Sequence, residues 1–259
     1  MLDLSLIRAV ILDMDGVIWR GQEPIGDLPA IFNQINRRGW RFVLATNNAT
    51  RTIDQYVQRI SGYGVQLESW QVVNSAIAAA DYLKELYPSG GPLYIIGMDG
   101  VHSALGEAGF YPADKNVLAV IASMNWNLTY EQLRRATLLI RAGAPLIATN
   151  SDRTFPTPEG LAPGAGAILA ALVAASDTEP VVVGKPSPAM YHIALHRLQL
   201  DPGQVLVIGD RAETDIAGAQ AIGCRTALVL SGVTTAEQAQ AWQPPPDLIA
   251  ADLASLVFQ

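Results

Sequence analysis

Short, continuous apolar segments alternate with amphipathic segments along this chain, and this alternation limits the fold more than any other feature. Residues 9–12 are all apolar and end at an acidic turn, as expected for a parallel strand that is buried on both faces. Asp27 is placed to cap a helix that ends at Gly39. Such alternation predicts a doubly wound α/β fold, a Rossmann-like parallel sheet with helices on both faces. The other elements expected in this sheet domain are strands at 41–45, 181–183, 205–208 and 226–230, and helices at 53–60, 190–198 and 216–222.

A second set of αβ elements lies between the two halves of this pattern. Residues 89–92 read Ser-Gly-Gly-Pro, which indicates a turn and not a linker between tethered domains. We therefore predict one sheet domain, residues 1–75 and 179–259, interrupted by an inserted αβ domain at residues 76–178. The elements expected in the insert are strands at 93–96, 117–121 and 146–148, and helices at 130–140 and 165–175.

Composition excludes several classes of protein. Hydrophobic residues make up 50% of the 259 and charged residues 16%, which favours a packed core over disorder. A net charge of −7 is a poor match for nucleic acid, although it does not exclude a small phosphorylated ligand. The single cysteine, Cys224, excludes an internal disulfide and a thiolate zinc cluster. No apolar run suits a membrane span and no signal peptide is evident, so we expect a cytoplasmic protein without a membrane partner.

Two acidic clusters follow predicted strands of the sheet domain. Asp13 and Asp15 come directly after residues 9–12, while Asp210 follows residues 205–208 and Asp215 lies one helical turn further on. Because open parallel sheets bind ligands at the carboxyl ends of their strands, these carboxylates are expected at one edge. Hard cations such as Mg²⁺ prefer oxygen ligands, and Asp13, Asp210 and the Asp15 carbonyl could supply them. The first cluster alone is explained equally well as an acidic turn closed by Gly16.

Two further polar clusters also follow predicted strands. Thr46, Asn47 and Asn48 come after residues 41–45 and could bind an anion near a helix start, although such residues also cap helices routinely. Lys185 lies between a glycine and a proline after residues 181–183, although most lysines are simply solvated. Each cluster alone favours the plainer explanation. Their joint occurrence favours one site with a nucleophile, an acid, anion donors and cation ligands.

These four clusters, in this order, resemble the four motifs of the haloacid dehalogenase (HAD) superfamily. Further matching segments are residues 148–152, 163–166, 184–186, 209–211 and 214–216, and the resemblance covers essentially the whole chain. The insert resembles the large αβ cap of subfamily IIA, which includes NagD-like and 4-nitrophenylphosphatase-like enzymes. The resemblance implies a HAD core with an inserted cap domain, and a Mg²⁺-dependent phosphatase that hydrolyses small phosphomonoesters through an aspartyl-phosphate intermediate.

The resemblance also assigns roles to residues of the core motifs. Asp13 would be the nucleophile and Asp15 the general acid and then base. Thr46, Asn47 and Asn48 would bind the transferring phosphoryl group, and Lys185 would neutralise its charge and orient Asp13. The Mg²⁺ ligands would be Asp13, Asp15 and Asp210, and Asp215 would support these ligands without contacting the ion. These roles agree with phosphoryl transfer, in which positioning and electrostatic stabilisation do most of the work.

Substrate choice is expected to reside in the insert, because the core motifs meet only a phosphoryl group and a cation. Asn150 and Asp152 follow residues 146–148 and are the candidate specificity residues, although they could instead make only turn hydrogen bonds. The chain departs from the family at residues 123–125, where Ser-Met-Asn stands in place of the usual Gly-x-Asp. Because that carboxylate is missing, the cap of a relative is a poor guide to the substrate of this chain.

Three alternative functions compete with a phosphatase. A dehalogenase would need no metal and hence no pair of Asp15 and Asp210. A catalytically retired phosphate-binding protein would have no reason to keep Asp13, Asp15, Lys185 and Asp210 together. A phosphate-accepting signalling switch would not need an inserted domain. The expected partner is a small phosphorylated metabolite, and caps of this size can also mediate a homodimer.

Overall fold

The structure is a computed structural model that describes residues 2–157 and 159–259. Its residues divide into two compact units. The first unit consists of Met1–Thr46, Asp54–Val73 and Met190–Gln259, and the second of Asn47–Ile53 and Asn74–Ala189. The domain limits predicted at residues 75/76 and 178/179 stay a prediction. No helix in the described part of the chain is long and apolar enough to cross a membrane.

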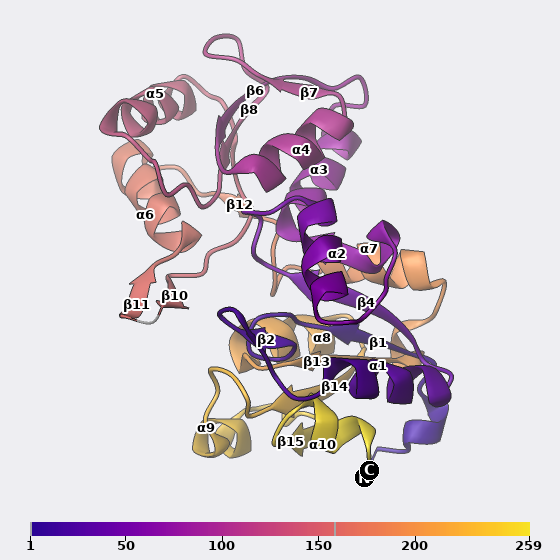
Figure 1. Ribbon diagram of the computed structural model, residues 1–259. Helices are drawn as coiled ribbons and strands as arrows, with labels where there is room; N and C mark the ends of the chain where they lie inside the picture. The colour runs from indigo at the N-terminus through magenta and orange to yellow at the C-terminus, as the bar shows by residue number, and fades with distance from the viewer. Residues whose placement is uncertain (1, 158) are drawn as a thin grey trace. The chain divides into compact units, whose positions relative to one another are not determined.

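A six-stranded sheet forms the centre of the first unit, in the order β15-β14-β13-β1-β4-β5 (Figure 1). Strand β1 is paired in parallel with β13 on one side and β4 on the other, with Ala9 opposite both Val205 and Arg41. All four residues of β1 are buried, as its apolar sequence predicts. The strands are β1 (Ala9–Leu12), β4 (Arg41–Thr46), β5 (Val72–Asn74), β13 (Val205–Gly209), β14 (Arg225–Val229) and β15 (Leu248–Ala250).

Helices flank this sheet, which confirms the predicted α/β class. The Asp27 carboxylate caps α1 by accepting a hydrogen bond from the backbone N–H of Ala30 at 3.0 Å, and Gly39 follows with φ +71°. The predicted helix at 216–222 begins earlier, as a π-helical turn (η4). The elements are η1 (Leu4–Leu6), β2 (Trp19–Arg20), β3 (Glu23–Pro24), α1 (Leu28–Arg37), α2 (Ile53–Gly62), η2 (Ser69–Gln71), α7 (Ala189–Leu198), η3 (Pro202–Gln204), η4 (Ala212–Ile216), α8 (Ala217–Ala221), α9 (Ala236–Ala241) and α10 (Leu253–Val257).

The second unit contains a five-stranded sheet in the order β12-β9-β8-β6-β7. The assignment of residues 181–183 to the sheet of the first unit is wrong, because β12 pairs in parallel with β9, with Val181 opposite Ile147. Local alternation shows that a strand is present but not which sheet it joins. The turn predicted at 89–92 is also shorter than expected, since β6 begins at Gly91. The strands are β6 (Gly91–Ile96), β7 (Phe110–Pro112), β8 (Ala119–Ala122), β9 (Leu146–Ala148) and β12 (Val181–Val182).

Helices cover both faces of this second sheet, with α5 and α6 on one side and α3 and α4 on the other (Figure 1). One core cluster joins Ile96, Val120 and Leu146 of the sheet to Ile140 of α5 and Leu172 of α6. A short antiparallel hairpin of β10 and β11 precedes α6. The elements are α3 (Ser75–Leu86), α4 (Asp99–Glu107), α5 (Tyr130–Arg141), β10 (Thr154–Thr157), β11 (Gly160–Pro163) and α6 (Ala165–Ser176).

Candidate active site

Two carboxylates lie at the ends of adjacent strands in the first unit. Asp13 directly follows β1, and its backbone N–H donates to the carbonyl of Ile208 at 2.9 Å, which continues the ladder to β13. Asp210 directly follows β13. Thr46, the last residue of β4, belongs to the strand on the other side of β1. All three predicted site residues are buried, and the parallel sheet brings them to the same edge.

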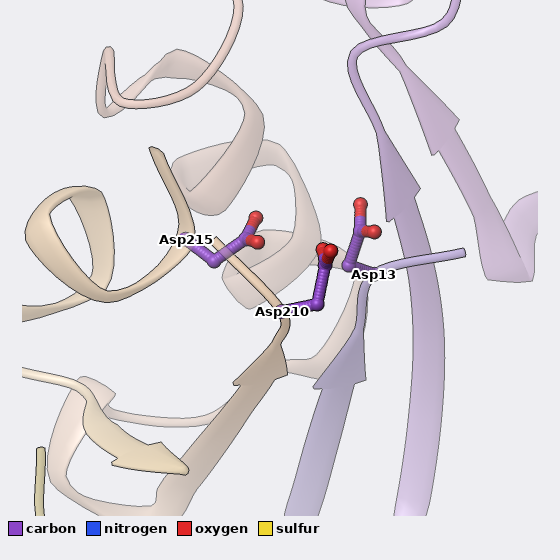
Figure 2. A group of neighbouring side chains, drawn as sticks. All are labelled: Asp13, Asp210 and Asp215. Carbon is purple, nitrogen blue, oxygen red and sulfur yellow. The ribbon is translucent and has the colours of Figure 1, made fainter. Parts of the chain in front are cut away.

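A third carboxylate joins Asp13 and Asp210. Asp215 lies in the η4 turn, and its Oδ2 accepts a hydrogen bond from the backbone N–H of Arg211 at 3.1 Å. One oxygen from each carboxylate lies within 4.8 Å of the others, and Figure 2 shows the three side chains beyond the ends of the two strands. A Cβ atom at Gly209 would lie 2.2 Å from Cβ of Asp215. The glycine therefore allows the turn to fold back onto the end of β13.

This cluster has the chemistry of a site for a hard divalent cation. Three buried carboxylates at such separations repel one another when ionised, and a bound cation offsets that repulsion. Carboxylate oxygens are also the ligands that Mg²⁺ prefers. The sequence predicted Asp13 and Asp210 as ligands, and Asp215 as a supporting residue that does not contact the ion. The structure brings the Asp215 carboxylate into the same cluster.

Asp15 is exposed, unlike the other three acidic residues of the predicted site, which are buried. Its Oδ1 accepts a hydrogen bond from Nε1 of Trp19 at 2.9 Å. Gly16, directly after Asp15, has φ +88°, and a Cβ there would lie 2.5 Å from Oδ2 of Asp210. The Asp15 carboxylate is thus bonded to Trp19 and is not a member of the three-carboxylate cluster. A contact of its backbone carbonyl with a cation stays a prediction.

The segment after β14 holds Asp210 in place, and its residues were not among those predicted from the sequence. The backbone N–H of Val233 donates to Asp210 Oδ2 at 2.7 Å, and that of Thr234 donates to the Asp210 carbonyl at 3.1 Å. Gly232 lies so close that a Cβ would be 1.9 Å from Asp210 Oδ2. The signal was present, because residues 231–235 are a polar segment that follows a predicted strand, as the four recognised clusters do.

In the second unit, Asn47 and Lys185 are joined by two hydrogen bonds. Lys185 donates its backbone N–H to Oδ1 of Asn47 at 2.7 Å, and Nδ2 of Asn47 donates to the Lys185 carbonyl at 3.0 Å. Lys185 is only 3% exposed, so the alternative of a solvated surface lysine is wrong. Gly184 permits this contact, because a Cβ there would lie 2.8 Å from Oδ1 of Asn47. Asn47 directly follows Thr46 in the chain.

The proposed specificity residues contact Asn47. The Asn150 side chain is buried, donates through Nδ2 to the Asn47 carbonyl at 2.8 Å and accepts from the Asp152 N–H at 3.1 Å. The second of these is the turn hydrogen bond of the plainer alternative. The Asp152 carboxylate accepts from Nδ2 of Asn47 at 3.3 and 3.4 Å. Both residues therefore belong to one polar network with Asn47, and their effect on specificity stays a prediction.

Two other asparagines make turn hydrogen bonds. Oδ1 of Asn48 accepts from the backbone N–H and the hydroxyl of Thr50, at 3.0 and 2.7 Å. Oδ1 of Asn125, which stands where the family pattern led us to expect an aspartate, accepts from the N–H of Asn127 at 2.9 Å. Asn48 thus shapes the start of the loop that leads to α2, and its predicted contact with a phosphoryl group stays a prediction.

Comparison with known proteins identifies the family. Residues 10–111 match the haloacid dehalogenase-like hydrolases, and residues 182–256 match the HAD-hydrolase-like family. The chain is 35% identical over 247 residues to an acid sugar phosphatase of Staphylococcus aureus (strain USA300), covering 95% of each chain. The chain belongs to the haloacid dehalogenase-like hydrolases.

Solved structures refine this placement. NagD from the E. coli K-12 strain superposes with a TM-score of 0.88 and 30% identity, covering 96% of this chain and 97% of that one. A glycerol phosphate phosphatase from Mycobacterium tuberculosis in complex with magnesium superposes with a TM-score of 0.91 and 33% identity, covering 99% of this chain and 78% of that one. These findings confirm the predicted subfamily IIA and a HAD-type phosphatase.

Proposed function

We propose that this HAD-type phosphatase is Mg²⁺-dependent and hydrolyses small phosphomonoesters through an aspartyl phosphate formed on Asp13. The observation that carries the proposal is the buried cluster of Asp13, Asp210 and Asp215, whose oxygens lie within 4.8 Å of one another. The magnesium complex of the mycobacterial relative supports the choice of ion. These three residues would hold Mg²⁺, with the Asp15 carbonyl as a further proposed ligand. The ion would supply positive charge to the phosphoryl oxygens.

The first chemical step transfers the phosphoryl group to the protein. An Oδ atom of Asp13 attacks phosphorus, and the bond from phosphorus to the ester oxygen breaks. Asp15 gives its proton to the departing alkoxide, which would otherwise leave as a strong base. The exposure of Asp15 supports this role, because a general acid must reach an oxygen of the substrate.

The second step returns Asp13 to its carboxylate form. Asp15, now ionised, takes a proton from a water molecule as that water attacks phosphorus, and the bond between phosphorus and Asp13 breaks. Inorganic phosphate leaves, and Asp15 is again protonated for the next cycle. One residue therefore serves as acid and then as base.

We further propose that Thr46, Asn47, Asn48 and Lys185 bind and neutralise the phosphoryl group. The burial of Lys185 and its two hydrogen bonds to Asn47 support a joint role, because each fixes the position of the other. A transferring phosphoryl group spreads its charge over its equatorial oxygens, so fixed donors and a lysine ammonium stabilise the transition state. Lys185 would also orient Asp13.

The substrate class proposed is a small phosphorylated metabolite such as a sugar or polyol phosphate. Relatives named as an acid sugar phosphatase and a glycerol phosphate phosphatase support it. Residues 76–178 are proposed as the cap domain that selects the leaving group, with Asn150 and Asp152 as its specificity residues. A homodimer through this cap and a cytoplasmic location stay predictions.

A direct test combines one variant with one panel of substrates. Wild-type protein should hydrolyse several sugar and polyol phosphates with Mg²⁺ and lose this activity in chelator. Asp13→Asn keeps the shape of the side chain but is a feeble nucleophile, so turnover should fall at least about a thousandfold with the fold intact. Activity of Asp13→Asn within tenfold of wild type would contradict the assignment. A wild-type enzyme that turns over equally well in chelator would favour the metal-free alternative.

A further inference from the structure

The indole of Trp19 is hydrogen-bonded to the carboxylate of Asp15. Trp19 is completely buried, whereas the Asp15 side chain is exposed. The one polar atom of the indole, Nε1, is only a donor, and it donates to Asp15 Oδ1 at 2.9 Å. An exposed carboxylate is thereby tied through one of its two oxygens to a side chain that cannot itself turn away.

Aromatic and cationic groups hold the indole in place. The ring of Tyr56 stacks on it, with centroids 6.5 Å apart and planes at 1°, and the Arg59 guanidinium carbon lies 3.8 Å from its centroid. Nη2 of Arg59 donates to the carbonyl of Gly21, in the turn of the β2–β3 hairpin. A guanidinium over an indole face is attracted by the electron density of the ring, most strongly when it is removed from water.

The backbone between Asp15 and Trp19 is closed into a tight loop. The N–H of Gly16 donates to the Trp19 carbonyl at 2.7 Å, and the N–H of Trp19 donates to the Met14 carbonyl at 3.2 Å. Gly16 occupies φ +88°, which L side chains rarely adopt. Only residues 16–18 therefore separate the acid from its anchor, and both ends of this short loop are fixed by backbone hydrogen bonds.

We propose that Trp19 is a positioning residue for the general acid, and this inference rests on the role of Asp15 proposed above. By holding Oδ1, the indole N–H leaves Oδ2 to carry the proton that passes to the leaving oxygen as its bond to phosphorus breaks. The same oxygen then takes the proton of the attacking water. Arg59 acts one step further back by fixing the indole. Trp19 itself would touch no reacting atom.

The test compares two leaving groups in Trp19→Phe, which keeps an aromatic ring but removes the N–H. Release of an alkoxide from glycerol phosphate needs a proton, so kcat/KM should fall about tenfold or more. Release of 4-nitrophenolate, a weak base, needs little help, so kcat/KM for 4-nitrophenyl phosphate should fall less than about threefold. The ratio of the two kcat/KM values is the readout, because kcat/KM leaves out the hydrolysis of the aspartyl phosphate, which both substrates share, and because a general loss of folded enzyme lowers both values equally.

Two further variants keep the test informative. Tyr63→Phe is the matched control, because the Tyr63 ring lies 6.3 Å from the Trp19 ring and its hydroxyl donates to the Gln22 carbonyl at 2.6 Å, away from Asp15. It should leave the ratio unchanged. Arg59→Met keeps the indole and removes the cation, so the ratio should shift in the direction of Trp19→Phe by a smaller factor. This second variant decides the question if Trp19→Phe does not fold.

Asp15→Asn separates this inference from the proposed function. Loss of glycerol phosphate hydrolysis in Asp15→Asn, with an unchanged ratio in both Trp19→Phe and Arg59→Met, would overturn the inference alone. Full activity of Asp15→Asn on both substrates would overturn the role of Asp15 and the inference with it. If the inference is right, Trp19→Phe added to Asp15→Asn should lower kcat/KM for neither substrate further.

Discussion

Replacement of Gly232 by alanine would disturb the candidate metal site without changing any charged group. The added Cβ would lie 1.9 Å from Oδ2 and 2.4 Å from Cγ of Asp210, where real Cβ contacts stay above 3.0 Å. The carboxylate or the loop must therefore move by about 1 Å. Such a shift also breaks the 2.7 Å hydrogen bond from Val233 N–H to Oδ2. A hydrogen bond to a charged group contributes about 1.5–3 kcal/mol, and a 1 Å displacement at an active site costs about a hundredfold in rate.

We therefore expect kcat/KM of Gly232→Ala to fall about a hundredfold, and calorimetric titration to show at least about tenfold weaker Mg²⁺ binding. The control is Gly203→Ala, since a Cβ at Gly203 would meet no atom within 4 Å and its φ is not positive. That variant should bind Mg²⁺ and turn over substrate like the wild type. If Gly232→Ala binds Mg²⁺ and hydrolyses substrate within about threefold of wild type, the segment after β14 does not position Asp210.

Three other predictions address the metal, the specificity and the cysteine. Asp210→Ala should lose at least about a hundredfold in activity and recover part of it at higher Mg²⁺, and a variant whose activity is independent of Mg²⁺ would contradict its role as a ligand. Asn150→Ala and Asp152→Ala should each change the relative kcat/KM across a phosphate panel about tenfold, and Asn150→Ala should also lower the free energy of unfolding by about 1–3 kcal/mol; equal scaling of all substrates would make this loop structural. Burial raises the pKa of the Cys224 thiol to about 12, so a thiol reagent at pH 9 should label native protein far more slowly than unfolded protein, and equal rates would contradict its burial. Between about pH 9 and about pH 12 the thiol is neutral in the folded protein but ionised in the unfolded protein. The stability that the buried neutral thiol contributes to the folded state should therefore be lost as pH rises through this range.

Local features of the fold were predictable because local sequence determines them. The strand at residues 9–12 and the helix between Asp27 and Gly39 follow from apolar patterning and capping, and the structure has both. The sheet to which residues 181–183 belong was not predictable, because pairing with β9 depends on contacts between distant parts of the chain. The same limit applies to the π-helical turn before α8, which depends on the fit of Gly209 against Asp215.

The candidate site, like the fold, has features that the sequence predicts and features that it does not. Parallel strands end at one edge, so the meeting of Asp13 and Asp210 could be inferred from their places after two strands. The anchoring of Asp15 by Trp19 could not be inferred from the sequence. A tryptophan four residues after an aspartate is expected to be an ordinary core residue, and only the structure shows that its indole N–H donates to Asp15. The burial of Lys185 could not be predicted from the sequence either, because Lys185 is paired with Asn47, 138 residues away in the chain.

The central claim is that Asp13 carries the phosphoryl group, and chemical trapping tests it most directly. Protein turning over 4-nitrophenyl phosphate with Mg²⁺ would be quenched in acid, reduced with borohydride and analysed by peptide mass spectrometry, because borohydride converts an aspartyl phosphate to homoserine. We predict homoserine at position 13 in the wild type and none in Asp13→Asn. Homoserine at a different aspartate, or a phosphoryl group on a serine, threonine or histidine in place of Asp13, would contradict the account.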